Sequence, residues 1–283
     1  MLAGVAAATF GMASVQTGAA IAISLFDRVG ALAVVALRLA SAAAFLVITS
    51  RPVLSRLRRT EALTFGAYGL IIASMNVFFY SSIERVPLGV AVALEMVGPI
   101  AVATLGSRRL LDLAIIGLAV AGVLVLALAP GVHGHITALG VFFALAAGAC
   151  WAGYILLSAH AARTLPGAQG LAIAMCVATV PMAFVAVGSA GTKLLDLRVL
   201  IAGAAVGLLS TGVPGMLDAA SLRRLRAATY ALVVSVAPAV GALAGFLFQG
   251  QRLSAAQWVG IAIVVAASAA AVAGAEPPDA TPV

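Results

Sequence analysis

Four polar side chains interrupt the long apolar runs of this chain: Gln16, Arg38, Asn76 and Glu95. A charged side chain inside an apolar run of membrane-spanning length is energetically expensive, so it marks a functional site and needs a partner. The guanidinium of Arg38 can bind a carboxylate, Glu95 can bind a cation or a proton, and the two amides can donate and accept hydrogen bonds. These residue types predict reversible binding of a small polar solute.

Glu95 lies in the stretch from Pro87 to Arg109, which is apolar enough to cross a bilayer. Pro99 follows Glu95 by four residues, and a proline removes a backbone donor and loosens the helix around it. Membrane helices tolerate this where neighbouring helices or a water-filled cavity satisfy the freed carbonyl. We therefore predict a hinge at Pro99, a kink at Pro214 and a second hinge at Pro238.

The composition requires a membrane. The chain is 64% hydrophobic and 9% charged, whereas soluble domains are about 45–50% apolar and about 25% charged. The formal net charge of +7 arises from basic residues clustered between apolar runs, which is typical of cytoplasmic loops facing anionic lipid. We therefore expect membrane lipid as a partner and no nucleic acid.

Apolar runs of about 20 residues are long enough to span a bilayer as helices. The sequence predicts an all-α membrane protein with ten transmembrane helices arranged as two five-helix repeats, residues 1–132 and 133–275, and a disordered tail at 276–283. The expected helices are 2–26, 31–50, 62–82, 87–106, 112–129, 138–159, 168–188, 199–221, 228–248 and 255–274.

The basic residues predict the orientation. With the N-terminus in the cytoplasm, the inner loops hold twice as many basic residues as the outer loops, which the positive-inside rule favours. Five helices is an odd number, so the second repeat must be inverted relative to the first, as in many secondary transporters. The inner residues are Arg51, Arg56, Arg58, Arg59, Arg108, Arg109, Arg163, Arg223, Arg224 and Arg226, and the outer residues are Arg28, Arg85, Lys193, Arg198 and Arg252.

The four polar residues come from four helices and fall at a similar depth. At 1.5 Å per residue, Arg38 and Glu95 lie roughly 10–12 Å below the outer boundary, and Gln16 and Asn76 roughly 9–15 Å below it. One interpretation is a structural ion pair between Arg38 and Glu95, with the two amides bridging helices. The other is a cavity that binds a small polar solute, and the two interpretations are compatible.

Other residues are open to both structural and functional interpretations. Trp151 and Tyr154, in the expected sixth helix, can line the same cavity or simply pack. Asp218 precedes Arg223 and Arg224 by about one turn, which indicates an interfacial ion pair. The GxxxG spacing of Gly241 and Gly245 and the isolated Cys150 and Cys176 favour packing roles.

The sequence contains no recognisable catalytic motif. His133 and His135 have no acidic neighbours, so we expect no metal site, and we expect no cofactor. A membrane enzyme acting on lipid would need a cluster of His, Asp or Glu at an interface, whereas Glu95 is essentially the only deep carboxylate. We therefore expect a transporter and no enzyme.

Three segments carry a family resemblance: ASVQTGAAIAISLFDRVGALAVVALRLA, MNVFFYSSIERVPLGVAVALEMVGPIAV and GACWAGYIL. They resemble the EamA branch of the drug/metabolite transporter superfamily, and within it the bacterial exporters of threonine and homoserine. The resemblance implies a proton-driven exporter of small amino acids in the inner membrane, a monomer or a homodimer. An alternative is transport of another small polar or aromatic metabolite. The positions that match the family pattern are Gln16, Arg38, Asn76, Tyr80, Glu95, Pro99 and Trp151.

The second half departs from the family pattern at two acidic positions. Relatives tend to have Glu-Pro where this chain has Ala237-Pro238, and Gly-Glu where it has Gly250-Gln251. With these two positions neutral, Glu95 becomes the candidate for coupling a proton to the substrate. In this hypothesis the substrate carboxylate binds Arg38 and its ammonium group competes with the proton at Glu95.

The charge bias predicts that both termini lie in the cytoplasm. A green fluorescent protein fused after Val283 should fluoresce, whereas alkaline phosphatase fused at the same position should be inactive, because each reporter works on only one side of the membrane. An active phosphatase at this position would contradict both the orientation and the inverted repeat.

Overall fold

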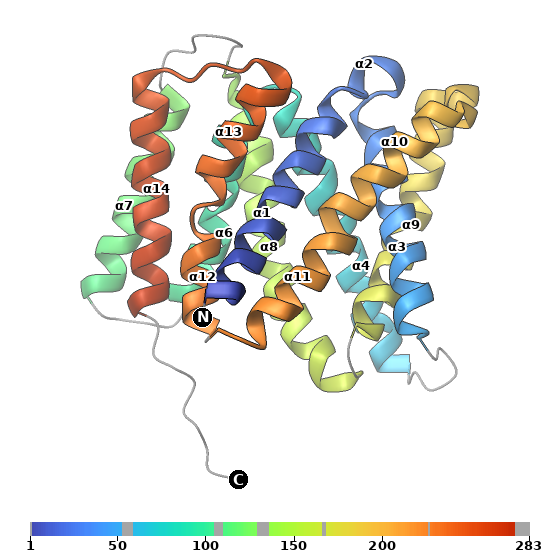
Figure 1. The fold of residues 1–283 in the computed structure, drawn as a ribbon, viewed down its shortest axis with the longest axis horizontal. Coiled ribbons are helices and arrows are strands. Elements are labelled where there is room, and N and C mark those ends of the chain that lie inside the picture. Colours follow the sequence, from blue (N-terminus) through green and yellow to red (C-terminus); the bar gives the residue numbers. More distant parts are fainter. Residues whose placement is uncertain are drawn as a thin grey trace.

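The computed structural model describes residues 2–52, 59–104, 110–128, 136–165, 168–225 and 227–274, and within these ranges the regular secondary structure is entirely helical. The helices form a bundle with the N-terminus at one end (Figure 1). The predicted tail at 276–283 and the basic residues Arg56, Arg58, Arg108, Arg109 and Arg226 lie outside the described residues.

The first half of the chain supplies seven helices. They are α1 (Leu2–Ile23), α2 (Phe26–Val29), α3 (Ala31–Ser50), α4 (Arg59–Ile83), α5 (Leu88–Glu95), α6 (Val97–Thr104) and α7 (Leu110–Leu128). The expected single helix at 87–106 is therefore two short helices, α5 and α6, separated by a turn at Met96.

The second half begins with α8 (Ala138–Thr164), which the Thr137 side chain caps by accepting a hydrogen bond from the Gly140 N–H at 3.0 Å. Satisfying an otherwise unpaired N–H fixes where this helix begins. The remaining elements are α9 (Gln169–Ala190), η2 (Gly191–Leu195), α10 (Leu197–Gly207), η3 (Leu208–Gly212), α11 (Val213–Leu222), α12 (Ala227–Val234), α13 (Ala237–Gln249) and α14 (Ala255–Gly274).

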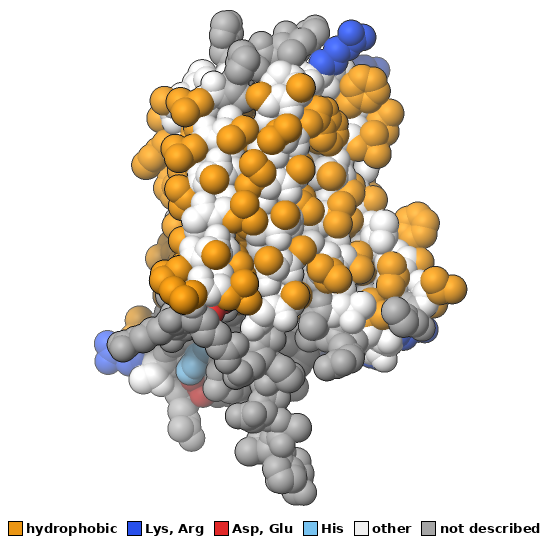
Figure 2. Space-filling model, turned by 90° about the vertical axis from the view of Figure 1, so that its left-hand side faces the viewer, with side chains coloured by type: hydrophobic (Ala, Val, Ile, Leu, Met, Phe, Trp, Pro, Cys, Tyr) orange, Lys and Arg blue, Asp and Glu red, His pale blue; other side chains and the backbone are white. Residues whose placement is uncertain are grey.

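Nine helical segments among the described residues are long and apolar enough to cross a membrane. The tenth expected segment, formed by α5 and α6, spans Leu88–Thr104 and is shorter. The surface agrees with a lipid environment: hydrophobic side chains cover the face formed by α7 and α14 (Figure 2). On this face Leu124 and Val259 are both 54% exposed, which would be unfavourable in water over so large an area.

Contacts between the two halves follow a regular pattern. Helix α3 packs against α9, α5 against α13, and α7 against α14. Helix α4 packs against α8 and α9, and α1 packs against α11 and α13. Helix α3 also packs against α10, and α5 and α6 both pack against α8. The core therefore lies between the halves, and it is built largely of alanine and small aliphatic side chains.

Small residues let these helices approach closely. A Cβ atom at Gly98 of α6 would collide with the carbonyl group of Gly148 of α8, and a Cβ at Gly89 of α5 would lie 2.5 Å from the Cβ of Ala242. Gly241 and Gly245 also have close neighbours from α1, α5 and the segment after α13, as expected for packing. Backbone approach of this kind is how helices associate without a hydrophobic driving force.

Gly98→Ala should destabilise the protein, because the added methyl meets backbone rather than a movable side chain; we expect a loss of about 1–3 kcal/mol or more. Gly117→Ala is the matched control: no heavy atom lies within 4 Å of its added Cβ, and alanine should stabilise that helix by about 0.5–1 kcal/mol. Thermal unfolding in detergent measures both. Equal melting temperatures for the two variants would contradict the close α6–α8 contact.

Candidate binding site

Arg38 is held between α3 and α4. Its Nη1 donates a hydrogen bond to Asn76 Oδ1, and its Cζ lies 5.6 Å from the centroid of the Tyr80 ring. The Asn76 Nδ2 group donates to the Ile72 carbonyl at 2.8 Å, which orients the amide so that its oxygen faces the guanidinium. Asn76 and Tyr80 are four residues apart, so they share one face of α4.

Glu95 is the last residue of α5 and is 9% exposed. The positive charge of Arg38 is near enough to the Glu95 carboxylate to interact with it electrostatically. The two side chains nevertheless form no ion pair, since Arg85–Glu84 is the only ion pair between described residues. The interpretation of Arg38 and Glu95 as a direct ion pair is therefore wrong for this conformation. The Asn76 amide, and not the Glu95 carboxylate, is the hydrogen-bond partner of the Arg38 guanidinium.

Gln16 reaches the same region from α1. A Cβ at Gly241 of α13 would lie 3.3 Å from Gln16 Oε1 and 3.3 Å from a methyl of Val92. Val92 precedes Glu95 by one turn of α5, so the Gln16 amide lies beside the face of α5 that ends in the carboxylate. Gln16 and Asn76 are 5% and 2% exposed.

Ser210 is a member of the site that the sequence analysis missed. It lies in η3, a π-helical segment between α10 and α11, close to the Tyr80 hydroxyl and to Gly18 of α1. The Ser14 hydroxyl of α1 donates to the neighbouring Leu209 carbonyl at 2.7 Å. Single π-helical turns inside helices are frequent at functional sites. The Ser-Thr-Gly run before Pro214 was the available signal.

Among the described residues, the site contains buried polar atoms that make no hydrogen bond of good geometry, although the Tyr80 hydroxyl lies close to both Arg38 and Ser210. Five buried side-chain atoms within the described residues lack a hydrogen-bond partner, and four of them are Gln16 Oε1, Arg38 Nε, Tyr80 Oη and Ser210 Oγ. Because such atoms are rare in native proteins, a gathering of four needs an explanation. Together they offer N–H and O–H donors for an anion and an amide oxygen for an ammonium group.

Residues 138–273 match the EamA-like transporter family. The threonine/homoserine exporter RhtA of Escherichia coli (strain K12) is 41% identical over 260 residues, which cover 91% of this chain and 87% of the relative. RhtA of Salmonella typhimurium (strain LT2) is 38% identical over 257 residues with the same coverage. The chain belongs to the EamA-like transporter family.

The fold has a counterpart among solved structures. One crystal structure superposes with a TM-score of 0.61 and covers 95% of this chain and 97% of its own, at 18% identity. At that identity the likeness concerns the fold alone. With its apolar helices and its transporter relatives, this EamA-family chain is a multi-pass membrane protein.

The two predicted aromatic site residues of α8 take different surroundings in this EamA-family protein. Trp151 packs at the edge of the apolar cluster that contains Leu94 and Met96, next to Glu95. Tyr154 instead packs against Tyr68 of α4, with ring centroids 5.3 Å apart. The structure thus brings Trp151 towards the predicted site and places Tyr154 in a second cluster.

Two of the predicted hinge prolines, Pro99 and Pro238, stand in the first turn after a helix break, whereas Pro214 lies inside a continuous helical span directly after the π-helical segment η3. Pro99 follows the turn at Met96, Pro214 follows η3, and Pro238 follows the turn between α12 and α13. Proline is tolerated in the first turn because its missing N–H has no intrahelical partner there. Pro99 and Pro238 therefore each mark the start of a new helix, whereas at Pro214 the helix continues through a π-helical turn.

Asp218 does not form the expected interfacial ion pair. Arg224 donates instead to the Ala220 carbonyl at 2.9 Å, and neither Arg223 nor Arg224 lies within ion-pair distance of Asp218. The Asp218 carboxylate faces the Tyr230 hydroxyl of α12 and lies against Gly11 of α1. Helix α11 turns this side chain into the bundle while the two arginines stay exposed.

A double-mutant cycle should find strong coupling between Arg38 and Asn76. We expect Arg38→Ala and Asn76→Ala to be non-additive by about 1–3 kcal/mol in the free energy of unfolding, because the hydrogen bond involves a buried charge. The matched control is the exposed pair Arg85–Glu84, for which coupling should stay below about 1 kcal/mol. Additive losses at Arg38 and Asn76 would refute the contact.

Proposed function

We propose that this protein is an inner-membrane secondary transporter that exports small amino acids of the threonine and homoserine type, coupled to protons. The observation that carries the proposal is the set of unsatisfied polar atoms around Arg38, since they match the two charged groups of an amino acid. The relatives named threonine/homoserine exporter support the choice of substrate.

Arg38 binds the substrate carboxylate in this proposal. Its neutral partners, Asn76 and Tyr80, hold the guanidinium in place without neutralising it. Its unpaired Nε–H and the hydroxyls of Tyr80 and Ser210 add donors for the same carboxylate. Hydrogen bonds between ionised groups are about twice as strong as neutral ones, so an anion is the ligand that this arrangement favours.

Glu95 binds the substrate ammonium group and also carries the coupling proton. The carboxylate lies at the broken end of α5, has no ion-pair partner among the described residues and adjoins Gln16 through Val92. A proton and an ammonium group compete for one carboxylate, so binding of one releases the other. This competition links export to the proton gradient, and it requires no second acid at Ala237 or Gln251.

Gln251 holds the first residue of the helix that carries Glu95. Its Oε1 accepts a hydrogen bond from the Leu88 N–H at 2.9 Å, at the first residue of α5. A neutral amide therefore caps the helix that carries Glu95 and adds no second acid beside that helix. The substitution relative to the family pattern is compatible with the proposal.

We also propose that the chain consists of two inverted five-helix repeats, 1–132 and 133–275, joined at residues 129–135, which lie outside the described ranges. The contact pattern supports this. In such a repeat α3 corresponds to α9, α5–α6 to α12–α13 and α7 to α14, and these equivalent elements pack against each other. The contacts of α4 with α8 and α9 mirror those of α10–α11 with α1 and α3.

Alternating access then proceeds by movement of one repeat against the other around the central polar groups. The helix breaks before Pro99 and Pro238 and the π-helical segment before Pro214 supply the backbone positions that can absorb a change in direction. We place both termini in the cytoplasm, on the basis of the basic residues in the loops.

Glu95→Gln tests the coupling. In proteoliposomes loaded with L-threonine, the variant should retain exchange but lose accumulation driven by a proton gradient, because glutamine can still hydrogen-bond an ammonium group but cannot bind a proton. Accumulation and exchange of radiolabelled threonine are measured on the same preparation. A variant that still accumulates threonine on a proton gradient would show that Glu95 is not the coupling residue.

A further inference from the structure

A second polar cluster lies nearer the end of the bundle that holds the N-terminus. It consists of Asp218 of α11, Tyr230 of α12, Tyr154 and Ser158 of α8, and Tyr68 of α4. The cluster does not include Arg38 or Glu95. Its members come from both halves of the chain, which is where a solute path between two repeats must run.

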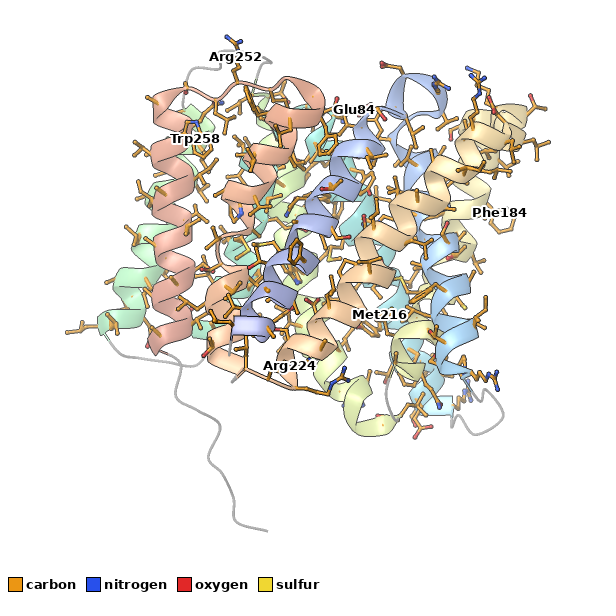
Figure 3. All side chains as sticks on the ribbon, in the orientation of Figure 1. Glu84, Phe184, Met216, Arg224, Arg252 and Trp258 are labelled. Atoms are coloured by element: carbon orange, nitrogen blue, oxygen red, sulfur yellow. The ribbon has the colours of Figure 1, made fainter. Side chains whose placement is uncertain are left out.

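Asp218 is the charged member of this cluster. It is half-buried, four residues before the end of α11, and thus about 6 Å from that end. Arg224, labelled near that end of the molecule in Figure 3, uses its guanidinium on a backbone carbonyl of its own helix. Asp218 is therefore a carboxylate in a membrane-spanning helix without a cationic partner among the described residues, a situation that calls for a functional explanation.

Aromatic rings continue from the carboxylate into the bundle. Tyr230 faces Asp218 and is in turn close to Tyr154, whose ring lies 5.3 Å from that of Tyr68. A carboxylate next to one tyrosine, with two further tyrosine rings behind it, is an arrangement that can bind a cation, because the carboxylate pairs with positive charge and aromatic ring faces attract it. Of the two charged groups of an amino acid, this cluster can favour only the ammonium group.

One face of α8 joins this cluster to Glu95. Cys150, Tyr154 and Ser158 are spaced four residues apart and so lie along one side of the helix. At one end of this side Ser158 lies near Tyr68. At the other end Cys150 is near enough to the Glu95 carboxylate to interact with its charge. The Glu95 carbonyl would lie only 2.7 Å from a Cβ at Gly148, so α5 ends directly against this part of α8. Polar side chains thus lead from Asp218 towards Glu95.

We propose that Asp218, with Tyr230, Tyr154 and Tyr68, forms a separate binding site for the ammonium group of the substrate on the cytoplasmic side of Glu95. The site receives the cationic end of the solute first and passes it along α8 to Glu95. This assignment of a side rests on the proposed function and orientation, whereas recognition of an ammonium group rests on the cluster itself.

Kinetics at the two faces of the membrane test the position of the site. In everted vesicles, where the cytoplasmic face meets the medium, Asp218→Asn should raise the KM for L-homoserine about tenfold or more, the loss expected for a charged hydrogen bond. In right-side-out vesicles the same variant should keep the wild-type KM. Tyr230→Phe should give a smaller rise on the cytoplasmic face only, and Asp218→Glu should restore the wild-type KM.

Glu61→Gln is the matched control, since it removes a carboxylate from the first turn of α4 that is not among the members of the cluster. It should leave KM unchanged at both faces. An equal effect of Asp218→Asn at the two faces, or no effect at either, would overturn the proposal. Correct folding of each variant is verified by its melting temperature in detergent.

A binding experiment decides the matter without transport. In detergent, ethylammonium should protect Asp218 from modification by a hydrophobic carbodiimide, as read by mass spectrometry of the labelled peptide, and Tyr230→Phe should weaken that protection. Absence of protection in the wild-type protein overturns the site. If ethylammonium protects Asp218 but the protein transports neither threonine nor homoserine, the ammonium site is supported and the proposed function is refuted.

Discussion

The guanidinium of Arg38 is held inside the helix bundle by an amide oxygen and an aromatic ring, and the chemistry of the site depends on this choice of partners. A direct pair with Glu95 would have to be broken whenever a substrate bound, and breaking a buried pair costs about 3–5 kcal/mol. Neutral partners fix the position of the cation but leave its charge available. Glu95, which has no ion-pair partner among the described residues, stays available for a cation or a proton.

The helix breaks bring these groups together. Glu95 occupies the last position of α5, where a turn redirects the chain into α6, and Gly98 lets α6 approach the backbone of α8. The Gln251 amide holds the other end of α5. The exposed backbone that a break creates in a membrane is satisfied by neighbouring helices, which explains why small residues gather at these crossings.

The sequence alone was sufficient for the position of most helices, because apolar runs of spanning length leave few alternatives. It also indicated Gln16, Arg38, Asn76 and Glu95 as lying at one level, since an ionisable group in an apolar helix must face the interior, whereas Tyr80 was indicated only by the family resemblance. The sequence could not predict which side chain contacts Arg38. Residue counting gives the depth of each side chain in the membrane, but the rotation of each helix about its own axis decides whether Arg38 contacts Glu95 or Asn76. The π-helical turn that presents Ser210 was missed for a related reason, because it depends on packing against α1 and α3.

Asp218 is a second residue whose side-chain contact could not be predicted from sequence spacing. Sequence spacing placed it one turn from two arginines, yet the side chains of α11 diverge, with the carboxylate turned inward and the arginines outward. The two halves of the chain share a contact pattern but distribute their polar groups unequally. Residues 227–249, which form α12 and α13, contain no Asp, Glu, Lys or Arg, whereas the equivalent pair α5–α6 contains Glu95. An uncharged broken helix can move against α1 and α5 without desolvating a charge. The first half thus supplies the charged groups Arg38 and Glu95, whereas α12 contributes the neutral Tyr230 and α13 an uncharged surface against α1 and α5.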